Sequence, residues 1–458
     1  MKTDLSHRVL AVLSLCMLLS FATSAQQEGT KNAKPDPDNP ASITGKSAPS
    51  AYKWANKKTK LDKDGDGIPD ALETTPINFG GVLVTLDPEK KDVILVVDFV
   101  GTDNANLPTV ESLAILLASF NSAPVKGLKG KTGIALHLVS IGSGYPLPSN
   151  SSIGTIANDE YDWSQLDTIK QNTIAANNLG SIPHIYHYCL SCNNYGGSGS
   201  SGISRNGIST YSQFRSGAVD SICSLQGYQS SVQAAGMTAG TIMHEFGHNL
   251  GLTHGGYDHV NYKPNYISIM NYHFQFDGIT VNGAHSYDYS RVLLKPLDER
   301  KIKEKAGLGS KAKGLGTQFS YQGYQNPFIL TGDLTKNVDW NFDGIIEKQA
   351  YPWNLNYPFD VDLTWLVSEK NWDNINFTGG GNIGGAVANS NVSDLVNQNY
   401  EGRFTKVPDN LKCRELTDAD KLAIETSQRK FSVEEILGPG VKMKITKSGN
   451  LTLYTLEQ

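Results

Sequence analysis

The stretch TIMHEFGHNLGLTHGG, residues 241–256, decides the fold of this chain. Residues four apart on a helix lie on the same face, so His244 and His248 can turn a ring nitrogen toward one metal ion. Glu245 lies about a hundred degrees further around the helix, where its carboxylate can touch a water molecule without binding the metal. The sequence therefore predicts a metal-binding helix over roughly residues 230–250.

Two residues beyond this helix explain the spacing of the motif. Gly251 can adopt backbone angles that other residues resist, so it can end the helix. Three residues later, His254 can return toward the first two histidines as a third zinc ligand. Three neutral imidazoles leave zinc its full charge and one open position, where the pKa of a water molecule falls to near neutrality. Glu245 is expected to be the general base toward that water.

The chain before this helix predicts a sheet. KDVILVVDFVG, which begins at Lys91, is a β-branched run of strand length, and residues 109–120 have helical spacing. KTGIALHLVSIG and IPHIYHYCL are two further predicted strands, and a Gly/Ser-rich loop is expected over residues 193–207. A strand, helix, strand succession of this size implies a parallel sheet.

The full pattern HEFGHNLGLTH resembles the extended zinc motif of the metzincin metalloproteases. Metzincins also carry a methionine turn beneath the metal, and YISIMNY supplies Met270 sixteen residues after His254. The resemblance implies that Tyr272, two residues further on, stabilises the oxyanion during catalysis. Longer phrases, including KDVILVVDFVG and NWDNINFTGGGNIGG, are similar to those of secreted metzincin-like zinc proteases predicted in many bacteria.

The resemblance implies an α/β (α+β) fold in which a metzincin-like catalytic domain has a twisted mixed sheet, the active-site helix and an irregular C-terminal subdomain. It implies a secreted zinc-dependent metalloendopeptidase, a hydrolase whose partner is a protein or peptide substrate lying extended between the two halves. One alternative is a calcium-binding surface or adhesion protein with an inactive zinc domain, although the intact Glu245 argues against it. Another is a zinc amidase acting on non-protein amides, which would use the same machinery and is separable only by assay.

The 458 residues divide into four predicted segments. Residues 1–25 have a basic start, a short apolar run and small residues, as in a cleaved secretory signal, with a membrane anchor as the alternative. Residues 26–90 are a linker or pro-segment, 91–385 the catalytic domain, and 386–458 an extension ending in a β-hairpin. The protein is therefore expected to be extracellular, with no membrane insertion after signal cleavage.

The net charge of −5 argues against a nucleic-acid or anionic-membrane partner, and a monomer is expected.

The segment LDKDGDGIPDALE predicts a calcium loop within residues 26–90. Carboxylates occupy loop positions one, three, five, nine and twelve, the spacing that surrounds one calcium ion: Asp62, Asp64, Asp66, Asp70 and Glu73. Carboxylates packed this closely repel one another without a counter-ion, which favours a calcium site over a solvated acidic turn. The segment resembles a single calcium-binding repeat of thrombospondin type 3.

A second segment, VDWNFDGIIEKQ, has a weaker form of the same pattern. Oxygen donors occupy positions one, three, five and nine: Asp339, Asn341, Asp343 and Glu347. Position twelve is Ala350, so the bidentate acid is missing. A calcium site and an ordinary acidic turn both remain open here.

Four cysteines remain after signal cleavage, and in an exported protein they are expected to form two disulfides: Cys189, Cys192, Cys223 and Cys413. Many metzincins block their zinc with a cysteine of the pro-segment, but residues 26–188 contain none. A cysteine switch of that kind is excluded by the sequence. The resemblance to metzincins implies another candidate for silencing the precursor, Asp36 or Asp38, because an aspartate has this role in some astacin-like zymogens.

Overall fold

The computed structural model describes the chain from residue 62 onward, with gaps. The described residues are 62–158, 160–179, 185–205, 220–258, 260–319, 328–330, 332–356, 361–375, 377, 404–406, 413–427 and 431–457. The predicted signal segment 1–25 and the two aspartates proposed for silencing, Asp36 and Asp38, lie outside them. In the described part, no helix has the length and apolar character needed to cross a lipid bilayer.

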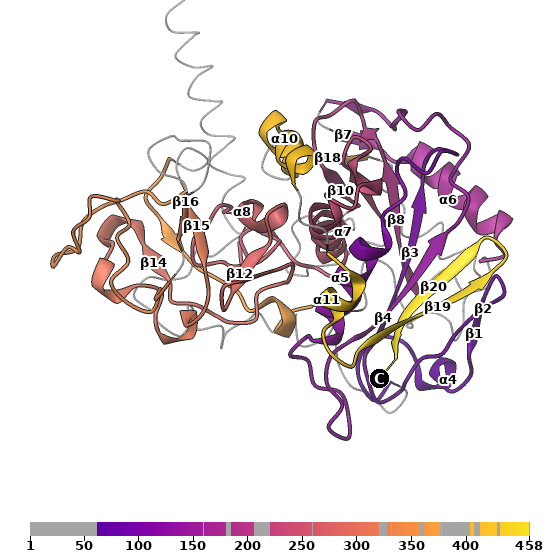
Figure 1. Ribbon diagram of the computed structural model, residues 1–458, viewed down its shortest axis with the longest axis horizontal. Coiled ribbons are helices and arrows are strands. Elements are labelled where there is room, and N and C mark those ends of the chain that lie inside the picture. Colours follow the sequence, from indigo (N-terminus) through magenta and orange to yellow (C-terminus); the bar gives the residue numbers. More distant parts are fainter. Residues whose placement is uncertain are drawn as a thin grey trace, which may run out of the picture.

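A mixed sheet forms the larger half of the molecule (Figure 1). Within the described residues it has seven strands, in the order β10-β11-β8-β3-β4-β20-β19. Its parallel centre comprises β11 (Asp220–Ser224), β8 (Tyr186–Cys192), β3 (Asp92–Phe99) and β4 (Ala135–Ile141). Its antiparallel margins are β10 (Gly202–Ser204) on one side and β20 (Leu451–Glu457) with β19 (Lys442–Ser448) on the other. The predicted α/β fold with a mixed sheet is therefore confirmed.

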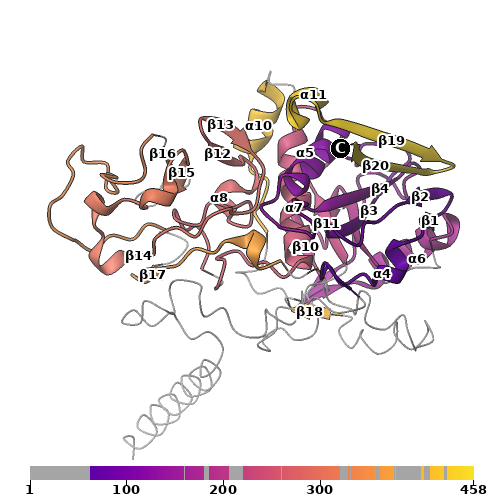
Figure 2. The same ribbon diagram turned by 90° about the horizontal axis from the view of Figure 1, so that it is seen from below.

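Strand β3 is buried along its whole length because both faces of the sheet are covered. Alternate side chains point to opposite faces, so Leu95 and Val97 join one core while Ile94 and Val96 join another. The first core contains helices α5 (Val110–Asn121) and α7 (Ala235–Asn249). The second contains α6 (Ser164–Ala176), β1 (Ile77–Phe79) and β2 (Val82–Val84), as the view in Figure 2 shows.

The predicted helix over 109–120 is α5, with Thr109 as its N-cap: the Thr109 hydroxyl accepts a hydrogen bond from the Ser112 N–H. The predicted metal-binding helix is α7, but it begins at Ala235 rather than near residue 230. Residues before it form the short 3-10 turn η1 (Tyr228–Ser230), and Ser231 is extended with ψ 128°. This extended residue separates the two helical segments.

The predicted Gly/Ser-rich loop over 193–207 contains two short strands, β9 (Asn194–Tyr195) and the sheet margin β10. Strand β11 was not predicted from the sequence. Its pattern, DSICS, shows no alternation because every residue is buried. The other short strands near this half are β5 (Ser152–Ile153), β6 (Ile156–Ala157), β7 (Glu160–Asp162) and β18 (Phe404–Lys406).

The half after Gly251 is irregular, as expected, and lies on the other side of α7 from the sheet (Figure 1). Its core gathers around Trp340 and Phe319. The helices and turns are α8 (Tyr272–Gln275), η2 (Glu299–Lys301), η3 (Glu304–Ala306), η4 (Ser310–Ala312) and η5 (Asn371–Asp373). The strands are β12 (Ile279–Val281), β13 (Ala284–Ser286), β14 (Leu297–Asp298), β15 (Thr317–Phe319), β16 (Phe328–Leu330) and β17 (Trp365–Leu366).

The C-terminal residues return to the sheet. The predicted terminal hairpin forms β19 and β20, and β20 pairs antiparallel with β4. Gly449 makes the turn with φ +55°, a backbone angle that favours glycine. Two helices precede the hairpin, α10 (Asp418–Thr426) and α11 (Val433–Leu437). Part of the predicted extension 386–458 is therefore built into the same sheet as β3 and β4.

All four cysteines expected in disulfides are free thiols and buried: Cys189, Cys192, Cys223 and Cys413. Cys189 and Cys192 are three residues apart on β8, so their side chains enter different cores. Cys223 is offset along the neighbouring strand, because Ser221 is the residue that pairs with Cys189. The structure thus differs from the two disulfides that the sequence predicts.

Candidate metal centre

The three motif histidines converge. The Nε2 atom of His254 lies 3.1 Å from Nε2 of His244 and 2.9 Å from Nε2 of His248. Two nitrogens bound to one tetrahedral zinc ion are about 3.4 Å apart, so the observed spacing is close to that of a ligand set.

Hydrogen bonds at Nδ1 fix how two of these three imidazoles are protonated. Nδ1 of His244 donates to the carbonyl oxygen of Ile269 at 2.7 Å, and Nδ1 of His248 donates to that of Leu252 at 2.8 Å. In a neutral ring whose proton is on Nδ1, Nε2 has a free lone pair, and this tautomer can bind a metal through Nε2. Burial and the nearby His248 also hold the pKa of His244 well below its usual value. Converging lone pairs need a cation between them, so the residues fit zinc.

Gly251 ends α7 as predicted, with φ +83°. The N–H of Gly251 donates to the His248 carbonyl, and the N–H of Leu252 donates to the Gly247 carbonyl. These two bonds and the left-handed glycine make a Schellman motif, which turns the chain sharply at the helix end. The turn brings His254 back over the face that carries the first two histidines.

Met270 packs directly beneath α7, at the place expected of the methionine turn. A Cβ atom built on Gly247 would lie 2.3 Å from the sulfur of Met270, so only glycine leaves room for this contact. Met270 is fully buried, and the preceding residue is the Ile269 that orients His244. The glycine within HEFGH is therefore explained by close packing of the methionine against the helix.

Tyr272 lies beside the histidines at the start of α8. Its ring centroid is 4.5 Å from that of His254 and 5.7 Å from that of His244. The Asn271 side chain caps this short helix by accepting from the His273 N–H. The structure thus brings Tyr272 to the histidines.

Glu245 is fully buried next to the three histidines. Its Oε1 atom accepts a hydrogen bond from the thiol of Cys413 at 2.7 Å, whereas Oε2 has no hydrogen-bond partner. Burial raises the pKa of Glu245 to about 8, although the Cys413 hydrogen bond lowers it. A Cβ atom on Gly202 would lie 2.5 Å from Oε1, so a glycine on β10 makes room for this carboxylate.

Cys413 is a member of the site that the sequence did not reveal. Ligand atoms of four residues lie within 4.8 Å of one another: His244, His248, His254 and Cys413. The sequence analysis predicted a disulfide for this cysteine, because four cysteines in an exported protein are expected to form two disulfides. Its position depends on the path of the chain far from the histidines.

The acidic loop curls around its own carboxylates. Asp62 accepts hydrogen bonds from the N–H groups of Gly65 and Gly67, at 2.7 and 3.0 Å. The carboxylates of Asp62, Asp64 and Asp66 are close enough together to hold one ion. This tight curl is the one predicted from the two glycines.

A second trio shares Asp66 and adds two residues, Glu73 and Asp92. Asp92 is the first residue of β3 and was not predicted, because it lies outside the loop spacing. Asp70, which was predicted at position nine, instead forms an ion pair with Lys63, and its Oδ1 accepts the Lys63 N–H at 2.9 Å. The structure thus places four of the five predicted loop residues in two groups that share Asp66, and Asp70 in neither.

The buried carboxylates of this cluster fit a hard cation. Both oxygens of Glu73 and the Oδ2 atom of Asp64 lack a hydrogen-bond partner. Burial, together with the neighbouring carboxylates, raises the pKa of Glu73 to about 9. Lys91 Nζ donates to the main-chain oxygens of Asp64 and Gly65 and supplies one positive charge. Buried carboxylates lie close together here, and carboxylate oxygens are the ligands that calcium prefers.

The second acidic loop is built differently. The side-chain amide of Asn341 donates to Asp343 at 3.1 Å and to Glu347 at 3.4 Å, and the Gly344 N–H donates to Asp339 at 2.9 Å. Most of the loop's side-chain oxygens therefore accept N–H groups of the loop itself, whereas Asp339 Oδ1 and Glu347 Oε2 are buried without a partner. Among the described residues, these four do not form one of the groups of acidic side chains close enough to hold an ion.

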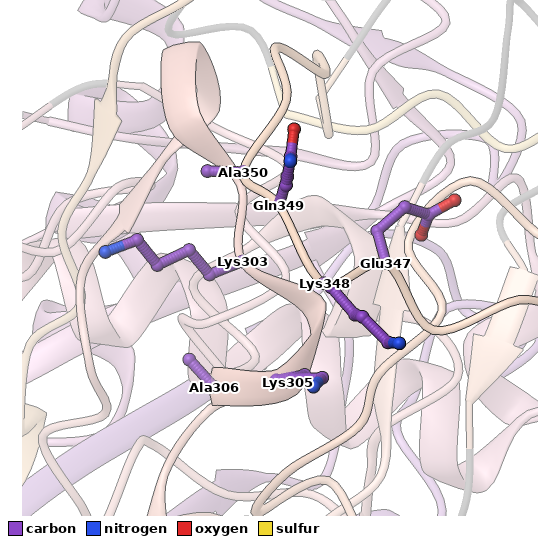
Figure 3. Close-up of a pocket in the computed structure, with 7 residues that line it drawn as sticks. All are labelled: Lys303, Lys305, Ala306, Glu347, Lys348, Gln349 and Ala350. Atoms are coloured by element: carbon purple, nitrogen blue, oxygen red, sulfur yellow. The ribbon is translucent and has the colours of Figure 1, made fainter.

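A surface pocket of about 300 Å³ borders this second loop (Figure 3). Its lining residues are Lys303, Lys305, Ala306, Glu347, Lys348, Gln349 and Ala350. This pocket shares no residue with the histidine site and is not part of it.

Comparison of the chain with models of known protein families finds no match. No curated protein is similar to it either. The resemblance to metzincins consequently stands on the motif residues themselves.

Proposed function

We propose that this protein is a secreted zinc-dependent metalloendopeptidase. The observation that carries the proposal is the convergence of three imidazole Nε2 atoms beside a buried glutamate. Zinc held by three neutral imidazoles is a Lewis acid toward a peptide carbonyl and lowers the pKa of a water molecule to near neutrality. The amino-terminal sequence, with its short apolar run, supports export.

The residues around the histidines have distinct proposed roles. Glu245 would accept the proton of the attacking water and pass it to the departing amine. Tyr272, whose ring stands beside His254, would donate its phenol hydrogen to the oxyanion that develops on the carbonyl. The carbonyls of Ile269 and Leu252 hold the histidine rings in the ligating tautomer throughout.

The edge of the sheet offers a place for an extended substrate. Strand β10 is the marginal strand, and Gly202 on it contacts the carboxylate of Glu245. An exposed strand edge can bind a peptide through main-chain hydrogen bonds, which suits an enzyme that cuts chains rather than one side chain. This proximity supports the endopeptidase over an amidase for non-protein substrates.

We further propose calcium as a structural cofactor in the loop 62–73. The support is the set of buried carboxylate oxygens without hydrogen-bond partners on Glu73 and Asp64. Asp66 and Asp92 link this cluster to β3, since the Asp92 N–H donates to Asp66 at 2.7 Å. The ion would fasten the loop to the sheet rather than take part in hydrolysis.

The decisive experiment replaces Glu245. Zinc-loaded protein is incubated for long periods with a proteome-derived peptide library, with and without a chelator, beside Glu245→Gln. We expect chelator-sensitive cleavage that falls by about 100- to 10,000-fold in the variant, because a general base contributes that much. Glu111→Gln, in the first turn of α5, is the matched control and should keep the parent rate.

Zinc content measured by mass spectrometry separates loss of the base from loss of the metal. Glu245→Gln should still bind zinc, since the three histidines are intact. Cleavage that persists at the parent rate in the zinc-loaded variant would contradict the proposed function.

A further inference from the structure

We infer that Cys413 is a fourth ligand of the metal and that residues 413–416 close the site, so that the protein folds into a self-inhibited form. This inference deepens the proposed function and rests on it. Cys413 is the only member of the four-residue donor group that comes from outside residues 244–254. Its sulfur lies within 4.8 Å of a ring nitrogen of each of the three histidines.

Most of the histidine site is buried, and His248 is its one partly exposed histidine. His244 and Glu245 are 0 % exposed and His254 is 1 % exposed. Cys413 is itself buried, at 3 %. His248 is partly exposed, whereas a peptide can reach His244, His254 or Glu245 only if part of the chain moves.

The covering segment lies along the end of the marginal strand. Glu415 forms an antiparallel bridge with Ser200, and the Ser201 N–H donates to the Arg414 carbonyl at 3.0 Å. The Ser200 hydroxyl donates to the Cys413 carbonyl at 3.1 Å. These main-chain contacts occupy the edge beside Gly202, where an extended substrate would pair.

Arg414 anchors the segment on the irregular half. Its guanidinium pairs with Asp420 at 2.9 Å and with Asp277 at 3.6 Å, and it stacks 4.4 Å above the ring of Phe276. Such a planar cation can satisfy a carboxylate and an aromatic face together. The segment is therefore held at a defined position rather than lying loosely over the site.

Helix α10 secures the downstream side of the segment. Leu416 and Ile424 are buried in the core that also contains α7. Thr417 and Asp420 form a reciprocal capping box at the start of the helix, and the Tyr228 hydroxyl donates to Glu425 at 2.9 Å. Figures 1 and 2 both draw α10 at the junction between the sheet and the irregular half.

The site contains an acceptor for the proton that Cys413 must lose when it binds the metal. Cysteine binds zinc as a thiolate, and the proton leaving Sγ has an acceptor in Glu245 Oε1, 2.7 Å away. Four protein ligands are typical of structural zinc, whereas a catalytic site keeps one position open. Cys413 would thus fill the open position and engage the general base at the same time.

A cobalt spectrum tests the ligand directly. The full chain is loaded with Co²⁺ in place of zinc, and its near-ultraviolet absorption is recorded. A thiolate ligand gives a sulfur-to-cobalt charge-transfer band, which we expect in the parent protein and not in Cys413→Ser. Cys192→Ser is the matched control, because that thiol donates to the Asn194 carbonyl in the opposite core, and it should keep the band.

Rates on the peptide library test closure. If the open form is about 1 % populated, Cys413→Ser in the zinc-loaded protein should cleave about 100-fold faster than the parent. Cys192→Ser should cleave at the parent rate. The gain should vanish in the Cys413→Ser, Glu245→Gln double variant.

The outcomes separate this inference from the proposed function. A parent protein without the charge-transfer band, or a band unchanged in Cys413→Ser, overturns the assignment of the ligand. A rate in Cys413→Ser no higher than in the parent, when the parent does cleave, overturns self-inhibition. If the band disappears in Cys413→Ser and neither protein cleaves any peptide, the ligand assignment stands and the peptidase proposal fails.

Discussion

The loops 62–73 and 339–350 share a spacing of acidic residues but differ in what surrounds them. In the first loop, Asp64, Asp66 and Glu73 are buried, and oxygens of Asp64 and Glu73 have no hydrogen-bond partner. In the second loop, Asp343 is exposed and its carboxylate accepts from the side chain of Asn341 and the Ile345 N–H. Asp339 Oδ1 and Glu347 Oε2 of the second loop are also buried without a partner. Among the described residues, however, only the first loop brings three carboxylates close enough to hold one ion.

The difference also depends on one residue that the spacing does not include. Asp92, at the start of β3, contributes a carboxylate to the first loop. The second loop has Ala350 at its twelfth position. There, the carboxylate of Glu304 accepts the N–H groups of Trp340 and Glu347 and holds the loop in place. A motif loop becomes a candidate site when the rest of the fold completes it.

Removing calcium should produce the largest change. At calcium a thousandfold above its dissociation constant, the proposed site stabilises the fold by about 4 kcal/mol, measured as the shift in thermal unfolding on chelation. Asp66→Asn should abolish this shift, because Asp66 belongs to both trios. Asp70→Asn is the control within the same motif: it should keep the shift, since Asp70 pairs with exposed Lys63. Equal shifts in the parent and Asp66→Asn would remove the distinction between the two loops.

Replacing Asp92 should have an intermediate effect. Asp92→Asn is expected to weaken calcium binding about tenfold, or about 1.4 kcal/mol, in isothermal titration calorimetry. Asp92 also pairs with His137 at 2.5 Å, so His137→Gln is needed to isolate that contact. If His137→Gln weakens calcium binding as much as Asp92→Asn does, the carboxylate is not a ligand.

Changing the second loop should have the smallest effect. Asp343→Asn is expected to alter stability by at most about 0.5 kcal/mol, since Asp343 is an exposed loop residue. The number of calcium ions bound per chain should not change. Loss of one bound ion in this variant would show that the exposed loop is a site after all.

The local parts of the metal centre could be predicted from the sequence. His244 and His248 share a helix face because of their spacing, and Gly251 sets the turn that returns His254. These features depend on backbone geometry over a few residues, which a short pattern encodes. The strand β3 could also be predicted from the sequence. A continuous run of β-branched residues is typical of a strand that is buried on both faces of a parallel sheet.

The long-range parts could not be predicted. Cys413 reaches the histidines only because the chain after the irregular half returns to the sheet edge, and no local pattern specifies that path. The sequence excludes a blocking cysteine only upstream of the motif, in residues 26–188. Cys413 lies downstream of it. The terminal hairpin was recognised as a hairpin, but its pairing with β4 is a tertiary choice.

The pairing of β20 with β4 also determines how residues 413–416 are tethered. Strand β18 pairs with β7 upstream of them, and the hairpin completes the sheet downstream, so both flanks are fastened to the fold. A blocking group attached in this way has a local concentration that dilution does not change. The proposed self-inhibition would then end when residues 413–416 move away from the histidines or when the chain beside them is cleaved. Without cleavage, the same residues could cover the site again.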